Sequence, residues 1–144
     1  MTSIAVGWLW QGDRVLLGRR SESMRLYPGM WDALGGHVEP GESPLAAVRR
    51  ELLEEIGVTA AAVSPIGTFE KPNPLEPGEL FFHVFVVTEW DGTPHLANGE
   101  HSDLRWFEFA EVAEMELPHA AYRPLLAALR QSRQSVVRLT RRCS

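Results

Sequence analysis

Both ends of one helix are marked within residues 43–57 of this 144-residue chain, and this segment constrains the fold more than any other. The Ser43 side chain can accept a hydrogen bond from a free amide of the first turn, and Pro44 loses nothing there because its nitrogen carries no hydrogen. Gly57 easily adopts the left-handed conformation that ends helices. The sequence therefore predicts a helix from about residue 44 to residue 56.

Extended segments lie before and after this helix, and a second helix closes the pattern. Apolar, β-branched or alternating runs separated by turn residues predict strands. The expected strands are Ile4 to Trp10, Arg14 to Arg20, Trp31 to Val38, Val63 to Glu70, Leu80 to Trp90 and Leu104 to Phe109, with a second helix from Pro118 to Gln131. This order favours an α+β fold with a mixed sheet covered by helices.

Length and composition limit the class of protein. We expect one domain over residues 1–132 and a loosely held basic tail over residues 133–144, because the chain is too short for two substantial domains. The net charge of -5 argues against a nucleic-acid-chain partner. The single cysteine, Cys143, has no intrachain partner, and the longest apolar run, Leu80 to Val87, is too short to span a membrane. A cytoplasmic protein without a membrane partner is expected.

Three glutamates of the first helix, Glu51, Glu54 and Glu55, fall within an arc of roughly 100° beside its apolar face. Like charges at this spacing repel by a few tenths of a kcal/mol per pair. A bound divalent cation would offset the repulsion, and Mg²⁺ is commonly held by carboxylates, waters and substrate phosphates. An ordinary solvated acidic face is the alternative interpretation of the three glutamates taken alone.

The loop before the helix adds to this site. Gly35 and Gly36 allow the backbone to approach a metal or a phosphate closely. Glu42 stands just before the helix, where its charge suits the helix dipole, and Arg50 can pair with a neighbouring carboxylate and fix its orientation. The loop and the helix together therefore form one candidate site.

The spacing of these residues resembles a known family motif. Gly36, Glu42 and the run from Arg50 to Val58 fill every defining position of the Nudix box. The resemblance implies the Nudix fold, a mixed β-sheet sandwiched between helices. It also implies a magnesium-dependent hydrolase, with Mn²⁺ as a substitute ion, that cuts the diphosphate linkage of a nucleotide.

The resemblance also assigns roles to single residues. It makes Glu51, Glu54 and Glu55 metal ligands, with the Gly35 carbonyl as a lesser candidate, and it makes Arg50 an orienting partner in catalysis, as it does Glu42. In this family the general base is either a glutamate of the box or a carboxylate from a later loop. Glu100 is the later candidate, as base and as ligand, and Asp103 is the alternative to it.

The substrate is less constrained than the reaction. The run from Leu26 to Gly36 is similar to the entry strand of MutT-type members, which hydrolyse nucleoside triphosphates, some of them oxidised. Many relatives have Leu-Pro where this chain has Ala33-Leu34, and this departure puts substrate identity in doubt. Pro74 stands in the loop where some relatives that cleave ADP-ribose carry a proline, so ADP-ribose or a nucleotide sugar is the alternative substrate.

The sequence also offers candidate substrate contacts and alternative functions. Gly35, Gly36, Phe81 and His83 are candidate substrate contacts, although aromatic strand residues are more often core. The histidines show no zinc spacing, so no zinc site is expected. A Nudix-fold module that senses a nucleotide without cutting it is the alternative to an enzyme, an RNA cap is a further substrate candidate, and a homodimer is the default assembly.

Overall fold

The computed structural model describes the backbone of residues 2–143 and the side chains of residues 2–132. Its strands are β1 (Thr2–Gln11), β2 (Arg14–Arg20), β3 (Trp31–Asp32), β4 (Leu34–His37), β5 (Thr59–Pro72), β6 (Glu79–Asp91) and β7 (His101–Glu108). Its helices are α1 (Pro44–Ile56), α2 (Phe109–Glu114) and α3 (Tyr122–Cys143). No helix among the described residues is long and apolar enough to cross a membrane.

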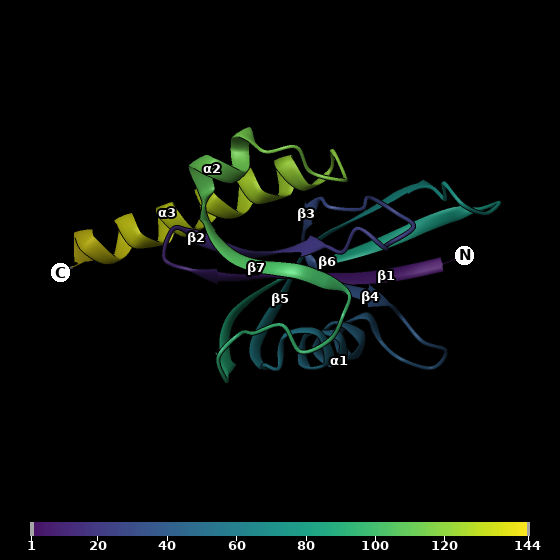
Figure 1. Cartoon of the computed structure of the whole chain (residues 1–144). Coiled ribbons are helices and arrows are strands. Elements are labelled where there is room, and N and C mark those ends of the chain that lie inside the picture. Colours follow the sequence, from purple (N-terminus) through teal and green to yellow (C-terminus); the bar gives the residue numbers. More distant parts are fainter. Residues whose placement is uncertain (1, 144) are drawn as a thin grey trace.

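The strands form one mixed sheet between two layers of helices. The strand order is β3-β2-β1-β6-β5, while β4 pairs with β1 and β7 pairs with β2. Strands β1 and β6 are parallel, and the other pairs are antiparallel. Helix α1 covers one face, and helices α2 and α3 cover the other (Figure 1). The predicted α+β fold, with a mixed sheet sandwiched between helices, is confirmed.

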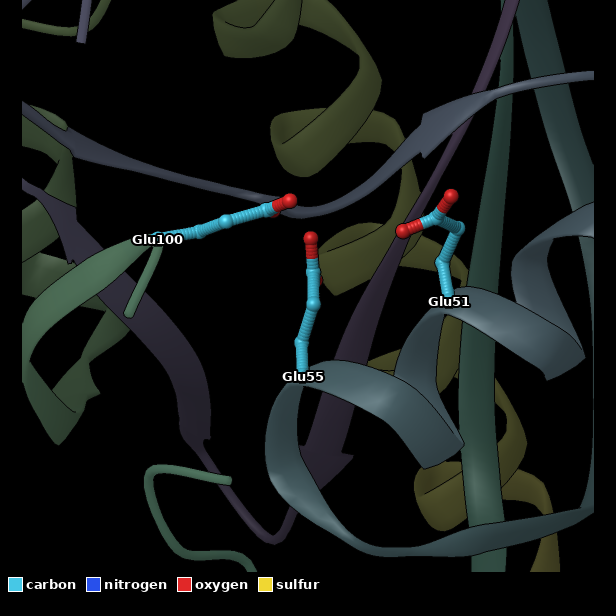
Figure 2. A group of neighbouring side chains, drawn as sticks. All are labelled: Glu51, Glu55 and Glu100. Atoms are coloured by element: carbon cyan, nitrogen blue, oxygen red, sulfur yellow. The ribbon is translucent and has the colours of Figure 1, made fainter. Parts of the chain in front are cut away.

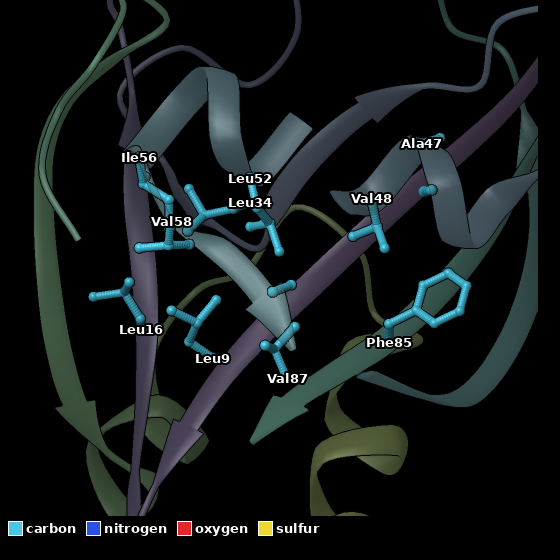
Figure 3. Packing of buried hydrophobic residues seen from close by; sticks show 12 residues of the cluster. Leu9, Leu16, Leu34, Ala47, Val48, Leu52, Ile56, Val58, Phe85 and Val87 are labelled. Atoms are coloured by element: carbon cyan, nitrogen blue, oxygen red, sulfur yellow. The ribbon is translucent and has the colours of Figure 1, made fainter. Parts of the chain in front are cut away.

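Helix α1 begins and ends as its sequence predicts. The Ser43 side chain accepts a hydrogen bond from the Ala46 amide at 3.1 Å. Gly57 has φ 69°, in the left-handed region, and its amide donates to the Leu53 carbonyl at 3.1 Å. The apolar face of α1 packs on the sheet, where Val48, Leu52 and Ile56 lie among buried strand residues (Figure 3).

Strand β1 divides the core into two parts. Because successive side chains of a strand point to opposite faces, Ala5 and Leu9 pack toward α1, whereas Val6, Trp8 and Trp10 pack on the other side. On that side the Trp8 ring meets the Tyr122 ring of α3 edge-on, with ring centroids 5.0 Å apart. Both faces of the central strand are therefore buried.

Some element boundaries differ from the sequence prediction. The single strand expected from Trp31 to Val38 is divided into β3, which pairs with β2, and β4, which pairs with β1. The second helix begins at Tyr122 rather than Pro118, and the short α2 precedes it. Helix α3 continues to Cys143. The side chains of the basic tail predicted for residues 133–144 lie outside the described residues.

Candidate functional site

Three carboxylates from two parts of the chain lie together beside strand β4. Glu51 and Glu55 project from α1 and Glu100 from the segment before β7, and one oxygen of each lies within 4.8 Å of the others (Figure 2). The segment that carries Glu100 is held to the end of α1, because the His95 amide donates to the Ile56 carbonyl at 3.1 Å and the Ala97 amide donates to the Glu55 carbonyl at 2.9 Å. The end of α1 therefore helps to place all three groups.

The central carboxyl of this group, Glu55, is buried without compensation. Glu55 is 1% exposed, and neither of its carboxyl oxygens has a hydrogen-bond partner. Burial, together with the nearby carboxyls of Glu100 and Glu51, raises its pKa to about 10. Burial also raises the pKa of Glu51. Unpartnered carboxyl oxygens in a close group fit a hard divalent cation such as Mg²⁺, which would supply the missing positive charge.

The remaining glutamate of the predicted set lies apart from this group. The Glu54 side chain is 55% exposed, and its Oε2 accepts a hydrogen bond from Arg50 Nη1 at 3.3 Å. Glu51 and Glu55 stand one turn apart on the side of α1 that faces the sheet, whereas Glu54 stands on the solvent side. The structure brings together Glu51, Glu55 and Glu100 but not Glu54, whose role as a ligand stays a prediction.

Arg50 connects the loop before α1 to the carboxylate group. Its Nε and Nη2 donate to the two carboxylate oxygens of Glu42 at 2.8 Å and 2.9 Å, and its Nη1 donates to Glu51 Oε1 at 2.8 Å. The hydrogen bonds from Arg50 lower the pKa of Glu42 to about 2. Arg50 Nη2 also donates to the His37 carbonyl at 3.0 Å. The Arg50 guanidinium, itself held by Glu42, therefore fixes the orientation of the Glu51 carboxyl.

The two glycines of β4 permit close packing around Glu51. A Cβ atom at Gly36 would lie 2.7 Å from the carboxyl carbon of Glu51, and a Cβ atom at Gly35 would lie 2.0 Å from the carbonyl oxygen of Ala5 on β1. Both glycines line the cavity described next. Only residues without a side chain leave room here for the carboxyl group and for the neighbouring strand.

The carboxylate group opens into a cavity of about 470 Å³, large enough for a nucleotide-sized ligand. Four buried side chains from β3, β6, α3 and the segment before α3 line the same cavity, and these are Asp32, Phe82, His119 and Tyr122. The Ala33 amide donates to Asp32 Oδ1 at 2.7 Å, and Arg20 Nη1 lies 3.8 Å from Asp32 Oδ2. Burial raises the pKa of Asp32 to about 6, against the opposing effect of Arg20. The cavity thus combines an acidic region with a mixed polar and aromatic region.

The two predicted substrate contacts on strand β6, Phe81 and His83, do not line the cavity. Leu80 and Phe82 line the cavity, whereas Phe81 and His83 do not. The Phe81 and His83 rings contact each other, with centroids 4.9 Å apart. Because side chains alternate between the two faces of a strand, an assignment that is one residue out selects the opposite face. The aromatic strand residue at the cavity is therefore Phe82.

Several cavity residues have no signal that sequence reasoning could have used. Asp32 lies in an apolar run, His119 reads as an ordinary surface or structural histidine, and Tyr122 stands in the apolar pattern of a helix. Their burial beside one cavity depends on the packing of α3 against the sheet. Asp103, the alternative to Glu100, accepts a hydrogen bond from Arg105 at 3.3 Å and does not line the cavity. The geometry therefore favours Glu100 over Asp103.

Comparison with known proteins gives a matching family model and similar curated proteins. A model described as the NUDIX domain matches residues 1–129. The chain is 38% identical to an isopentenyl-diphosphate Delta-isomerase of Nocardia farcinica, over 79% of this chain and 67% of that protein. It is 38% identical to a putative 8-oxo-dGTP diphosphatase of Bacillus subtilis, over 67% of this chain and 58% of that protein.

The solved structures agree on the fold. The MutT protein from Methanosarcina mazei Go1 matches with a TM-score of 0.78 and 26% identity, covering 92% of this chain and 94% of that one. The two curated relatives are longer than the region they share with this chain, which spans 67% of one and 58% of the other. They also carry different activities in their names, so similarity alone does not choose a reaction.

Proposed function

The chain belongs to the Nudix family, and from this premise we propose that it is a magnesium-dependent hydrolase that cleaves the diphosphate linkage of a nucleoside triphosphate or a related nucleotide. One observation carries the proposal. Glu51, Glu55 and Glu100 converge to within 4.8 Å, and two unpartnered oxygens of a buried carboxyl lie at their centre. Such a group is costly in a folded protein unless a cation neutralises it.

Each residue of the group has a distinct task in this reaction. Glu51, Glu55 and Glu100 would hold the ion, and the exposed Glu54 and the Gly35 carbonyl are additional candidate ligands. When bound there, Mg²⁺ would supply positive charge to the phosphate oxygens and would make a water molecule acidic enough to attack phosphorus. Glu100 is our candidate for the group that accepts the proton of that water. Arg50 keeps the Glu51 carboxylate in place while the negative charge of the substrate changes.

The cavity supports a nucleotide as the substrate. Its volume of about 470 Å³ and the buried ring of Phe82 suit a base, while the carboxylate group suits the ion that accompanies a polyphosphate. The 38% identity to a protein named as a putative 8-oxo-dGTP diphosphatase favours a purine nucleoside triphosphate, oxidised forms included. ADP-ribose or a nucleotide sugar is the alternative substrate. A cytoplasmic location and a homodimer stay predictions from the sequence.

The test is release of phosphate or pyrophosphate with and without Mg²⁺ across purine and pyrimidine nucleoside triphosphates, 8-oxo-dGTP, ADP-ribose and nucleotide sugars. We expect magnesium-dependent release from the triphosphates, lowered by orders of magnitude in Glu55→Gln and Glu100→Gln. Glu89→Gln is the matched control, because Glu89 is exposed on β6 and does not line the cavity. Equal activity in Glu55→Gln and Glu89→Gln would reject the assignment of the site.

A second arm of the same experiment tests isomerisation, because one relative is named as an isopentenyl-diphosphate isomerase. Isopentenyl diphosphate is incubated with the protein and Mg²⁺, and the products are separated. Isomerised product without release from any nucleotide would contradict hydrolysis. Binding of a triphosphate without turnover of any substrate in the panel would indicate a nucleotide-sensing module instead.

A further inference from the structure

Lys71 is the only lysine of the chain, and it joins three separate elements behind the cavity wall. Its Nζ donates to the Tyr27 hydroxyl oxygen at 2.6 Å and lies 3.1 Å from His119 Nδ1. Lys71 belongs to β5, Tyr27 to the loop of residues 21–30 between β2 and β3, and His119 to the segment between α2 and α3. Tyr27 and His119 line the cavity, whereas Lys71 does not. Its contacts therefore act on the cavity through these two side chains.

The chemistry of an ammonium group fixes the proton positions of its partners. A lysine ammonium group has three donors and no acceptor, so both the Tyr27 oxygen and His119 Nδ1 must accept. Burial, together with the charges of Lys71 and Arg20, lowers the pKa of His119 to about 4, so the ring is neutral at physiological pH. A neutral imidazole carries one proton, and Nδ1 is already an acceptor. The proton of His119 therefore lies on Nε2, which is a donor.

Packing holds this ring in one place. His119 is 6% exposed, and its ring centroid lies 4.6 Å from that of Phe82, 5.0 Å from that of Tyr122 and 5.2 Å from that of Tyr27. No hydrogen bond to Nε2 occurs among the side chains that the structure describes. A fixed neutral ring with one free N–H group gives the cavity wall a directional donor.

An acceptor, Asp32, lines the same cavity as His119. Asp32 is buried, lines the cavity and is close enough to the Tyr122 hydroxyl to raise the pKa of that phenol well above its usual value, together with burial. Tyr122 also lines the cavity, so Asp32 and the Tyr122 hydroxyl form one polar region of its wall. Donor and acceptor groups therefore surround one part of the cavity.

We propose that Lys71 is a positioning residue which fixes His119 as a donor, so that the cavity selects a base with a carbonyl group over one with an amino group at the same place. The proposal rests on the proposed function and names the substrate class as 6-oxopurine nucleotides. A carbonyl oxygen accepts from His119 Nε2–H, and the ring N–H beside the carbonyl donates to Asp32. An amino group would place its own N–H against that of His119 and leave the donor unpaired.

Inosine and adenosine triphosphates provide the matched test, because their bases differ only in this edge. We expect kcat/KM for ITP to exceed that for ATP by about 10-fold or more, as is common when one buried hydrogen-bonding group is mismatched. In Lys71→Met the ratio should fall toward 1, mainly through a lower kcat/KM for ITP. In Lys71→Arg it should be largely retained, because a guanidinium group is also only a donor. An unchanged ratio in folded Lys71→Met would overturn the proposal.

A second measurement reads the proton position directly and needs no substrate. Nitrogen-15 NMR of the histidine rings in the whole protein, with the His119 signals identified by loss in His119→Gln, distinguishes the two neutral tautomers. We expect the proton on Nε2 in the wild type and in Lys71→Arg, and a changed tautomer or mixture in Lys71→Met. A wild-type proton on Nδ1 of His119 would contradict the proposal even if both Lys71 variants failed to fold.

The two proposals fail in different ways. If no triphosphate is hydrolysed, the proposed function fails, and binding of inosine and adenosine diphosphates to the wild type and Lys71→Met still measures selectivity. If both triphosphates are hydrolysed equally well by the wild type, hydrolysis stands and the selectivity proposal is rejected.

Discussion

Replacing Glu55 with glutamine should stabilise the protein in the absence of metal while abolishing its response to Mg²⁺. Glu55 is almost fully buried, and burial raises its pKa to about 10 from the ordinary value of 4.5. The folded-state pKa exceeds the unfolded-state pKa, so the stability contribution of this group is complete below about pH 4.5 and is lost as the pH rises toward 10. At neutral pH the metal-free protein therefore carries a penalty that glutamine removes.

The size of the effect follows from the pKa shift. Each pH unit between the two pKa values costs about 1.4 kcal/mol, so at about pH 7.5 the upper limit is about 4 kcal/mol. Coupling to Glu51 and Glu100 and imperfect packing of the new amide reduce this gain, and we expect about 1 to 4 kcal/mol. For a chain of this length the gain corresponds to a rise in Tm of several degrees.

Thermal unfolding of the wild type and Glu55→Gln in a chelator, across about pH 5 to 9, measures this difference. The Tm of the wild type should fall with pH relative to that of the variant. Saturating Mg²⁺ should then raise the wild-type stability by about 2.7 kcal/mol at 100 times the Kd, and that of the variant far less. A variant that is less stable than the metal-free wild type over the whole pH range would refute the reasoning.

Three further perturbations test other parts of the site. Arg50→Lys keeps the charge but loses the paired hydrogen bonds, so kcat/KM should fall by about 10- to 100-fold while circular dichroism stays unchanged; retained activity would contradict an orienting role. Gly36→Ala brings a methyl group to 2.7 Å from the Glu51 carboxyl carbon and should weaken Mg²⁺ binding in a titration, whereas Gly99→Ala, whose Cβ meets nothing within 4 Å, should not. Asp32 has a folded-state pKa of about 6 against an ordinary value of 3.8, so its stability contribution is lost as the pH rises through 6. Asp32→Asn should therefore flatten the dependence of Tm on pH in that range, and an unchanged slope would count against this reasoning.

The parts of the fold that sequence predicts are those with local causes. Helix α1 begins after Ser43 and ends at Gly57 because both caps act within one turn of the chain. The division of β3 from β4 could not be predicted in the same way, because it depends on which neighbouring strand each half pairs with. The boundary of α3 had the same difficulty, since Pro118 marks the loop before the helix rather than its first turn.

In the candidate site, too, the residues with local causes could be predicted and those that depend on packing could not. The α1 carboxylates and Arg50 could be named because their spacing along one helix is visible in sequence. Glu100 could be named only through resemblance, because hydrogen bonds between the segment before β7 and the end of α1 bring it to Glu55. His119 and Lys71 could not be paired at all, since 48 positions separate them and only the packed structure places their nitrogens 3.1 Å apart.

One crossing of the chain connects the two regions of the cavity. Trp31 and Asp32 pair with β2, and from Leu34 the chain pairs with β1, so the backbone changes its partner strand at Ala33. The crossing places Asp32 in the part of the cavity that contains Tyr122, and it places Gly35 and Gly36 against Glu51 a few residues later. A change in the crossing would therefore shift Asp32, the proposed base contact, and at the same time the glycines that pack against Glu51. We therefore expect substitutions at Ala33-Leu34 to change substrate preference while every carboxylate of the site is kept.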